Sequence, residues 1–193
     1  MHALLLAGAT TQLVDVHGGT APQWAEVQGQ PTTAELIRQH AAPPQPAAAS
    51  AAATSDAGGP AVSSSASLPR ETYESAKRGE LQKVVKWLRK EVSVDALCPA
   101  STVDGQTATF GLLHAAAANG HLEMMRELLK RGASVDLLSS LGGTPLMEAA
   151  HHDQLSVMLI LLQHSANPDL QDVYGHTALT KATHLGHGAC VWA

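Results

Sequence analysis

The sequence predicts an all-α solenoid built from stacked pairs of short helices. Apolar residues recur with helical spacing in several segments, the pattern repeats every 33 residues, and turn-forming residues separate the copies. A period of this length is typical of repeats that each form one supersecondary unit and bury their apolar faces only against neighbours. We therefore expect a row of similar units rather than one central core.

The second helix of each expected pair has one apolar face. In Glu80–Lys90 the apolar residues Leu81, Val84 and Leu88 lie at helical offsets, with charged residues on the other side. The segments around Met125 and Met158 repeat this pattern. Shorter alanine-rich helices are expected to precede the amphipathic ones, at Leu112–Asn119, Pro145–His152 and Ala178–Leu185.

The period is visible in several residue sets at once. Gly120, Asp153 and Gly186 are spaced by 33, as are Leu113, Leu146 and Leu179, and Ala116, Ala149 and Ala182. The most informative segments are Gly143–Leu146, Leu113–Ala117, Asn119–His121 and Leu128–Ala133. They resemble the ankyrin repeat, and the resemblance covers 71–193. It implies a solenoid of helix-turn-helix units with projecting loop fingers.

The residue types at these positions have physical reasons. Pro145 stands in the first helical turn, where its missing N–H is not needed, and Thr144 can cap the same helix. Gly120 suits the left-handed conformation that ends a helix, and Asp153 tolerates it. Small alanines let the inner helices approach closely, while the leucine pairs fill the space between units.

Composition divides the chain into three parts. Residues 1–42 carry about one and a half partial ankyrin repeats, and 43–70 form a linker of Ala, Pro and Ser that we expect to be disordered. A short alanine helix is the alternative there, but prolines and glycines confine it to about two turns. The main repeat domain spans 71–193, with units at about 71–97, 104–137, 138–170 and an incomplete 171–193.

The ends of the repeat pattern carry further expectations. Eight extra residues enlarge the first finger, in the loop from Leu97 to Phe110. The segment 1–42 has too few units to fold alone, so it either docks onto the main stack or stays partly disordered. The last outer helix stops before its leucine pair, which predicts that Val191 and Trp192 are exposed and that the protein is truncated at both ends.

Composition and motifs disfavour several classes of function. The 193 residues carry 12 Lys and Arg against 17 Asp and Glu, a net charge of −5, which argues against binding a phosphate backbone. No apolar run approaches the ~18–20 residues of a membrane span. The two cysteines match no metal-binding spacing, and the common phosphate-binding, dinucleotide-binding and hydrolase motifs do not occur. We expect no enzyme activity, no metal or other cofactor, and neither nucleic acid nor membrane as partner.

The resemblance implies a non-catalytic protein–protein interaction module, a scaffold or adaptor. We expect a monomer that is cytoplasmic or, as a second compartment, nuclear. Its protein partner would lie across the finger tips and the concave inner-helix face. The finger candidates are Leu138, Ser140, Leu141, Gln171, Val173 and Tyr174. The concave-face candidates are Ala118, Asn119, Glu148, His151, His152, Lys181 and His184.

Two alternatives stay open from the sequence. The chain could be a regulatory ankyrin segment of a larger signalling enzyme whose catalytic domain lies outside it. His151 and His184, 33 residues apart, could also converge on zinc, with His152 or His187 as a third ligand. Polar residues lining the concave groove are the interpretation that we favour for these histidines.

The repeat register makes a direct stability prediction at Leu128, which it places in the core between units. Replacing Leu128 with Ala should lower the free energy of unfolding by about 2–5 kcal/mol, because the substitution leaves a cavity. Urea denaturation followed by circular dichroism measures this loss. An unchanged unfolding curve would contradict the register.

Overall fold

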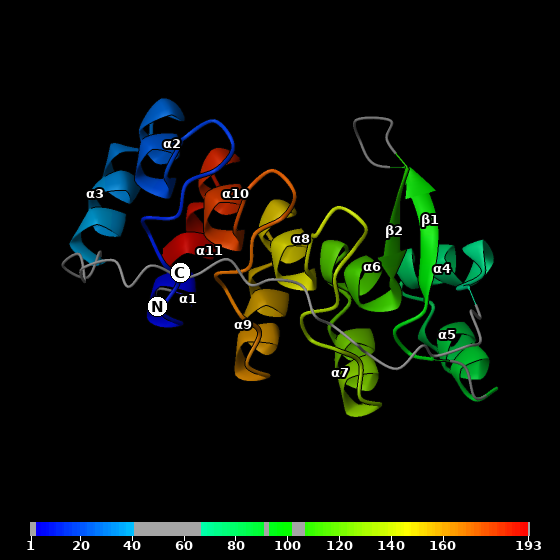
Figure 1. Cartoon of the computed structure of the whole chain (residues 1–193). Coiled ribbons are helices and arrows are strands. Elements are labelled where there is room, and N and C mark those ends of the chain that lie inside the picture. Colours follow the sequence, from blue (N-terminus) through cyan, green and yellow to red (C-terminus); the bar gives the residue numbers. More distant parts are fainter. Residues whose placement is uncertain (1–2, 41–66, 91–92, 102–106, 193) are drawn as a thin grey trace.

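The computed structural model describes residues 3–40, 67–90, 93–101 and 107–192, and it forms an elongated stack of helix pairs (Figure 1). One helix of each pair lies in an inner row and the other in an outer row. Most of the predicted linker, 43–70, lies outside the described residues. The all-α solenoid expected from the sequence is confirmed.

The helices are short, and those predicted from the sequence are present to within two residues at each end. The inner row consists, in its order along the stack, of α4 (Arg70–Lys77), α6 (Leu112–Ala118), α8 (Pro145–His151), α10 (Ala178–His184) and α2 (Ala21–Val27). The outer row consists of α5 (Leu81–Leu88), α7 (Leu122–Lys130), α9 (Leu155–Gln163), α11 (Gly188–Trp192) with α1 (Ala3–Leu6), and α3 (Pro31–His40).

Threonine caps and left-handed turns fix the ends of the inner helices. The hydroxyl of Thr144 accepts a hydrogen bond from the N–H of Met147 at 3.2 Å, and Thr177 caps α10 in the same way. The turn after α8 has Asp153 at φ 54°, at the position where the neighbouring repeat has Gly120 at φ 71°. The predicted tolerance of Asp153 in this conformation is therefore confirmed.

Alanines form the contact surface between successive inner helices. Ala116, Ala149 and Ala182 are fully buried, and their small side chains allow the helix backbones to approach closely. Leu128 is 1% exposed and Leu161 is fully buried between the rows. The core consequently runs as a continuous strip through all units of the stack.

The enlarged first finger is a β-hairpin, which the sequence did not predict. Strand β1 (Leu97–Ser101) pairs antiparallel with β2 (Thr107–Gly111), and Leu97 lies opposite Gly111. Pro99 removes one ladder donor from β1, which is tolerated because the sheet has only two strands. The hairpin projects from the edge where the other fingers lie and adds Phe110 to the concave side.

The N-terminal residues complete the last outer helix of the main stack. Helix α1 packs against α11, with Leu4 fully buried and Leu5 only 8% exposed. Val191 is fully buried too, so its predicted exposure is wrong. The two leucines take the places that the leucine pair has in the other outer helices, since the N–H of Ala9 bonds to the carbonyl of Leu4 as that of Ala133 bonds to Leu128. The side chain of Trp192 lies outside the described residues.

A repeated hydrogen bond shows that the N-terminal segment keeps the register of the stack. In each case an aspartate of one unit accepts a bond from the backbone N–H of a residue in the next unit. The three pairs are Ser134 with Asp95 at 3.0 Å, Asn167 with Asp136 at 3.1 Å, and Thr10 with Asp169 at 2.6 Å. The N–H of Thr10 therefore takes the place that the N–H groups of Ser134 and Asn167 have in their own units.

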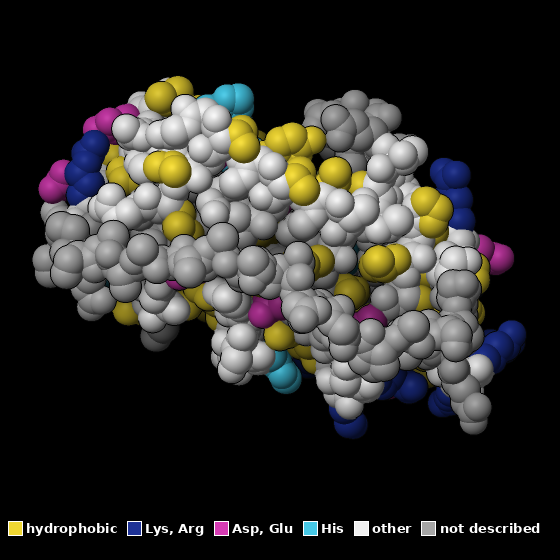
Figure 2. Space-filling model, in the orientation of Figure 1, with side chains coloured by type: hydrophobic (Ala, Val, Ile, Leu, Met, Phe, Trp, Pro, Cys, Tyr) yellow, Lys and Arg dark blue, Asp and Glu magenta, His cyan; other side chains and the backbone are white. Residues whose placement is uncertain are grey.

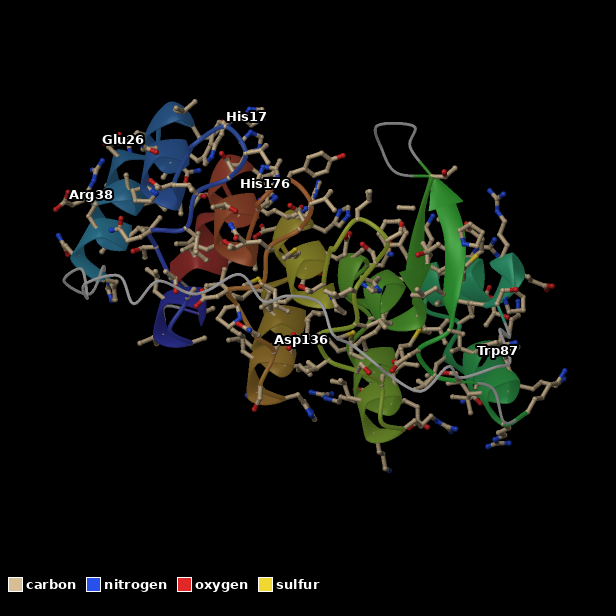
Figure 3. All side chains as sticks on the ribbon, viewed as in Figure 1. His17, Glu26, Arg38, Trp87, Asp136 and His176 are labelled. Carbon is tan, nitrogen blue, oxygen red and sulfur yellow. The ribbon has the colours of Figure 1, made fainter. Side chains whose placement is uncertain are left out.

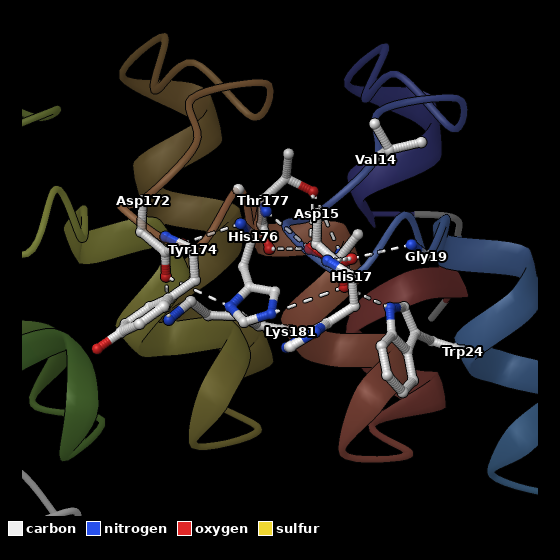
Figure 4. A network of polar contacts seen from close by, with 12 residues as sticks. Val14, Asp15, His17, Gly19, Trp24, Asp172, Tyr174, His176, Thr177 and Lys181 are labelled. Carbon is white, nitrogen blue, oxygen red and sulfur yellow. Dashed lines mark hydrogen bonds and ion pairs between the residues drawn. The ribbon is translucent and has the colours of Figure 1, made fainter.

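Helices α2 and α3 form a further unit against α10. Trp24 on α2 contacts His184 edge-to-face, with ring centroids 4.8 Å apart. In the adjoining finger the carboxylate of Asp15 accepts the indole N–H of Trp24 at 2.8 Å and lies 3.8 Å from His176 (Figure 4). Of the two possibilities that the sequence left open, the structure has the docked one for residues 3–40.

The two ends of the stack differ in surface charge. Lys and Arg side chains gather over α5 and α7, at the end where Trp87 lies, as Figures 2 and 3 show. At the opposite end, Arg38 on α3 forms an ion pair with Glu26 on α2. Such polarity steers the approach of a charged partner without specifying its identity.

Docking of α1 predicts a stability difference between two neighbouring leucines. Leu4 is fully buried, whereas Leu6 is 65% exposed. Leu4→Ala should lower the free energy of unfolding by about 2–5 kcal/mol because of the cavity that it leaves. Leu6→Ala serves as the control and should change it by less than about 0.5 kcal/mol. Equal urea-unfolding curves for both variants would contradict the docking of α1.

Candidate functional site

A hollow lies on the concave face of the stack, over α6 and between α4 and α8. Its volume is about 460 Å³. The inner helices contribute Tyr73, Lys77, His114, Ala115, Ala118, Glu148, His151 and Lys181, with Asn119 and His152 at the helix ends. The finger side contributes Phe110, Ser139, Leu141, Gly143, Asp172 and Tyr174.

The hollow exists because α6 presents alanines where its neighbours present larger side chains. Ala115 and Ala118 lie on its floor, and the residues 33 positions later are Glu148 and His151. On the other side, α4 places Tyr73 at the rim. The missing side-chain volume of one repeat thus creates a cavity flanked by polar groups of the next.

Hydrogen-bonded finger turns form the roof of the hollow. The hydroxyl of Ser139 accepts a hydrogen bond from the N–H of Gly143 at 3.0 Å. The carbonyl of Ser139 also accepts the N–H of Gly142, which closes a tight turn. One finger further along, Asp172 accepts the N–H groups of Tyr174 and His176. These bonds hold the finger tips in place above the inner helices, which favours binding by a preformed surface.

Two polar side chains in the hollow are left without partners. Within the described residues, the carboxylate of Glu148 takes part in no hydrogen bond or ion pair, and burial raises its pKa. Both ring nitrogens of His151 are buried and lack a hydrogen-bond partner in the same part of the chain. Burial, and then the nearby His152 and Lys181, lower the pKa of His151 to about 4, so its ring is neutral near neutral pH.

The lysines that line the hollow already have acidic partners. Lys181 forms an ion pair with Asp172 at 2.9 Å, and Lys77 lies 3.7 Å from Glu74. His176 and Lys181 hold the pKa of Asp172 far below its usual range, although burial opposes them. Lys181 is therefore bonded to Asp172 and attracts the carboxylate of Glu148 only through space, without forming an ion pair with it.

His114 has a structural task. Its Nδ1 accepts the N–H of Gly111 at 3.2 Å, and its Nε2 lies 3.0 Å from the carbonyl oxygen of Gly143. The ring therefore links the start of α6 to the next finger, and this pattern assigns the proton to Nε2. Burial lowers the pKa of His114 to about 4. His121 is likewise structural, since its Nε2 lies 2.8 Å from the carbonyl oxygen of Lys77.

Comparison with known proteins identifies the family. A family model described as ankyrin repeats in three copies matches residues 73–172 and 113–193, which together make up more than half of the chain. The chain belongs to the ankyrin-repeat family. It is also similar to histone-lysine N-methyltransferase EHMT1 of Mus musculus and of Homo sapiens, at 38% identity over 71 residues in each case. The match covers 37% of this chain and 5% of each relative.

The ankyrin stack brings many of the predicted binding residues together. The candidates that line the hollow are Ala118, Asn119, Glu148, His151, His152, Lys181, Leu141 and Tyr174. The other candidates lie outside it: Leu138, Ser140, Val173, Gln171 and His184. Gln171 donates to a backbone carbonyl of Val14, and His184 contacts Trp24, so both belong to the surface that meets the N-terminal segment.

The side of the hollow that faces the first ankyrin unit was not predicted from the sequence. Tyr73 and Phe110 line the hollow, but neither was among the predicted binding residues. Phe110 reaches it through the unpredicted β-hairpin. Tyr73 stands at the position of His114 in the next repeat, 41 residues later, and that correspondence could have marked it as an inner-helix residue.

The zinc alternative finds no geometric support. No three His, Cys, Asp or Glu side chains in 3–40, 67–90, 93–101 and 107–192 are close enough to share a metal ion. The imidazole of His187 instead lies 3.0 Å from the backbone carbonyl of His151.

The helices of the described ankyrin units are also too short, or too polar, to cross a membrane.

Burial of neutral His114 makes the stability of the ankyrin stack pH-dependent. Its pKa is about 4 when folded and 6.5 as the reference for an unfolded chain, so the unfolded state gains a proton first as the pH falls. Stability is full above about pH 6.5, and about 3 kcal/mol should be lost between there and pH 4. Urea unfolding at a series of pH values measures the slope.

Two variants separate the contribution of His114 from the general effect of acid. His114→Gln should be less stable at neutral pH, because it disturbs the bonds to Gly111 and Gly143, but its stability should depend less on pH. His17→Gln alters an exposed loop residue and should keep the slope of the unaltered chain. Identical slopes for all three proteins would show that His114 is not the titrating group.

Proposed function

We propose that the chain is a non-catalytic protein–protein interaction module, acting as a scaffold or adaptor. The observation that carries this proposal is the hollow on the concave face, which joins apolar finger residues to polar groups without partners. Ankyrin repeats generally serve protein binding, and stacked repeats offer an extended concave surface for it.

Exposed apolar side chains at the finger tips support the same conclusion. Leu138 is 51% exposed, Val173 57% and Tyr174 39%. They lie on consecutive fingers, and the backbone N–H of Val173 bonds to the carbonyl of Leu141 on the preceding finger. Exposure of these apolar side chains does not stabilise the fold. On fingers that are fixed by hydrogen bonds, they are favourable anchors for a partner.

The chemistry of the cysteines fits a binding role. Cys98 on β1 and Cys190 on α11 are buried, and burial raises the pKa of each thiol. A raised pKa disfavours the thiolate form that a nucleophilic cysteine needs.

We place the protein in the cytoplasm or nucleus, as a monomer that binds one protein partner.

One finding favours a second candidate, a regulatory ankyrin segment within a larger enzyme. The relatives at 38% identity are histone-lysine N-methyltransferases by name, although the chain matches only 5% of their length. Sequencing the full transcript distinguishes the two candidates. Further repeats alone would favour the adaptor, and an appended catalytic domain would favour the regulatory segment.

Leu141 is the most direct test of partner binding through the fingers. Peptides selected from a random library on the whole chain should bind Leu141→Asp at least about tenfold more weakly, because a charge replaces an apolar anchor in the hollow. Fluorescence anisotropy measures the affinity, and circular dichroism checks that the helical content and the melting temperature are kept.

Leu159→Asp provides the matched control. Leu159 is 41% exposed on the outer helix α9, so its replacement leaves the concave face unchanged. The selected peptides should bind this variant as tightly as the unaltered chain. Peptides that bind all three proteins equally would contradict a finger-and-groove binding surface.

A further inference from the structure

We infer that the hollow over Ala115 and Ala118 receives an arginine side chain of the partner polypeptide. This inference rests on the proposed function, since it names the chemistry of what the concave face binds. It follows from the number and kind of acceptor atoms that surround the hollow and from the absence, among its described lining residues, of an unpaired lysine.

Glu148 supplies the negative charge that an arginine needs. Its carboxylate stands beside the alanine floor, and no described residue donates a hydrogen bond to it or forms an ion pair with it. Burial raises the pKa of this half-buried carboxyl group, and a guanidinium group would stabilise its ionised form through two parallel N–H bonds. A cationic hydrogen-bond donor from a partner would therefore bind favourably beside Glu148.

Further acceptors match the remaining guanidinium donors. Tyr73 lines the hollow opposite Glu148, and its hydroxyl has no hydrogen bond within the described residues. Asn119 donates its amide N–H to the carbonyl of Ala115 at 2.8 Å, which leaves the amide oxygen as an acceptor. His151 adds a neutral ring, of which the one unprotonated nitrogen can accept a bond. An arginine has five N–H donors in a planar arrangement to meet such a set.

The surroundings favour arginine over lysine. A lysine ammonium group has three donors at one point and is strongly hydrated, whereas the planar guanidinium is weakly hydrated and stacks on aromatic rings. Phe110 and Tyr174 on the finger side provide such rings. Lys77 and Lys181 are paired with Glu74 and Asp172, which reduces their repulsion of an incoming cation, although Lys181 still disfavours positive charge on His151.

The test uses the whole chain and a defined probe, N-acetyl-arginine N-methylamide. Titration followed by NMR should shift the methyl signals of Ala115 and Ala118, with a dissociation constant in the millimolar range, as expected for a small ligand. The lysine analogue should bind about tenfold more weakly. Equal binding of the two probes, or no shift at these methyls, would overturn the assignment.

Three variants refine the test. Glu148→Gln keeps the shape and should weaken the arginine probe at least about tenfold, because the charge-assisted bonds are lost. Ala118→Leu fills the hollow and should have a similar effect. Glu123→Gln, on the outer helix α7 with a side chain 76% exposed, should change nothing. Unaltered affinity in Glu148→Gln, with the fold intact by circular dichroism, would also overturn the assignment.

The outcomes separate this inference from the proposed function. If selected peptides bind in a Leu141-dependent manner but the arginine probe does not bind, the arginine site is wrong and the interaction module stands. If the probe binds beside Glu148 but no selected peptide depends on Leu141, the partner-binding function fails and a small-molecule site remains in its place.

Discussion

Each helix pair of this molecule has apolar faces that only a neighbouring pair can bury. The stack therefore depends on the close approach of its inner helices, which the buried Ala116, Ala149 and Ala182 allow. Small side chains also shape the concave surface. Ala115 and Ala118 of α6 face the groove and leave the space above the helix open, and the candidate site lies there.

The fold was predictable because the repeat period places independent residues in equivalent roles. Thr144 and Thr177 cap equivalent helices, and Asp153 takes the left-handed turn of Gly120. The position of the N-terminal segment was not predictable in this way. Periodicity shows that Leu4 and Leu5 fit a repeat, but it does not say which end of the stack they join. That choice is made by tertiary contacts, chiefly with α10 and α11.

The candidate site was predictable on the side where repeats are regular. Glu148, His151 and Lys181 follow from their positions on the inner helices, and all three line the hollow. The hairpin side escaped prediction, because a two-stranded finger has no counterpart in the other repeats and its strands contain little of the usual alternation. The lack of a partner for Glu148 was also invisible, since hydrogen-bond satisfaction depends on distances rather than on sequence spacing.

The place of residues 3–40 in the stack changes how the chain should fold. A repeat array normally folds by adding neighbours that are adjacent in the chain, so its contacts are local. Here Thr10 meets Asp169, 159 residues away, and the segment that begins the chain closes the array from its far end. Closing so long a loop costs entropy before any contact compensates it. Residues 3–40 should consequently join the stack late in folding. Because they pack against α10 and α11, the N-terminal segment and these C-terminal helices should also unfold together.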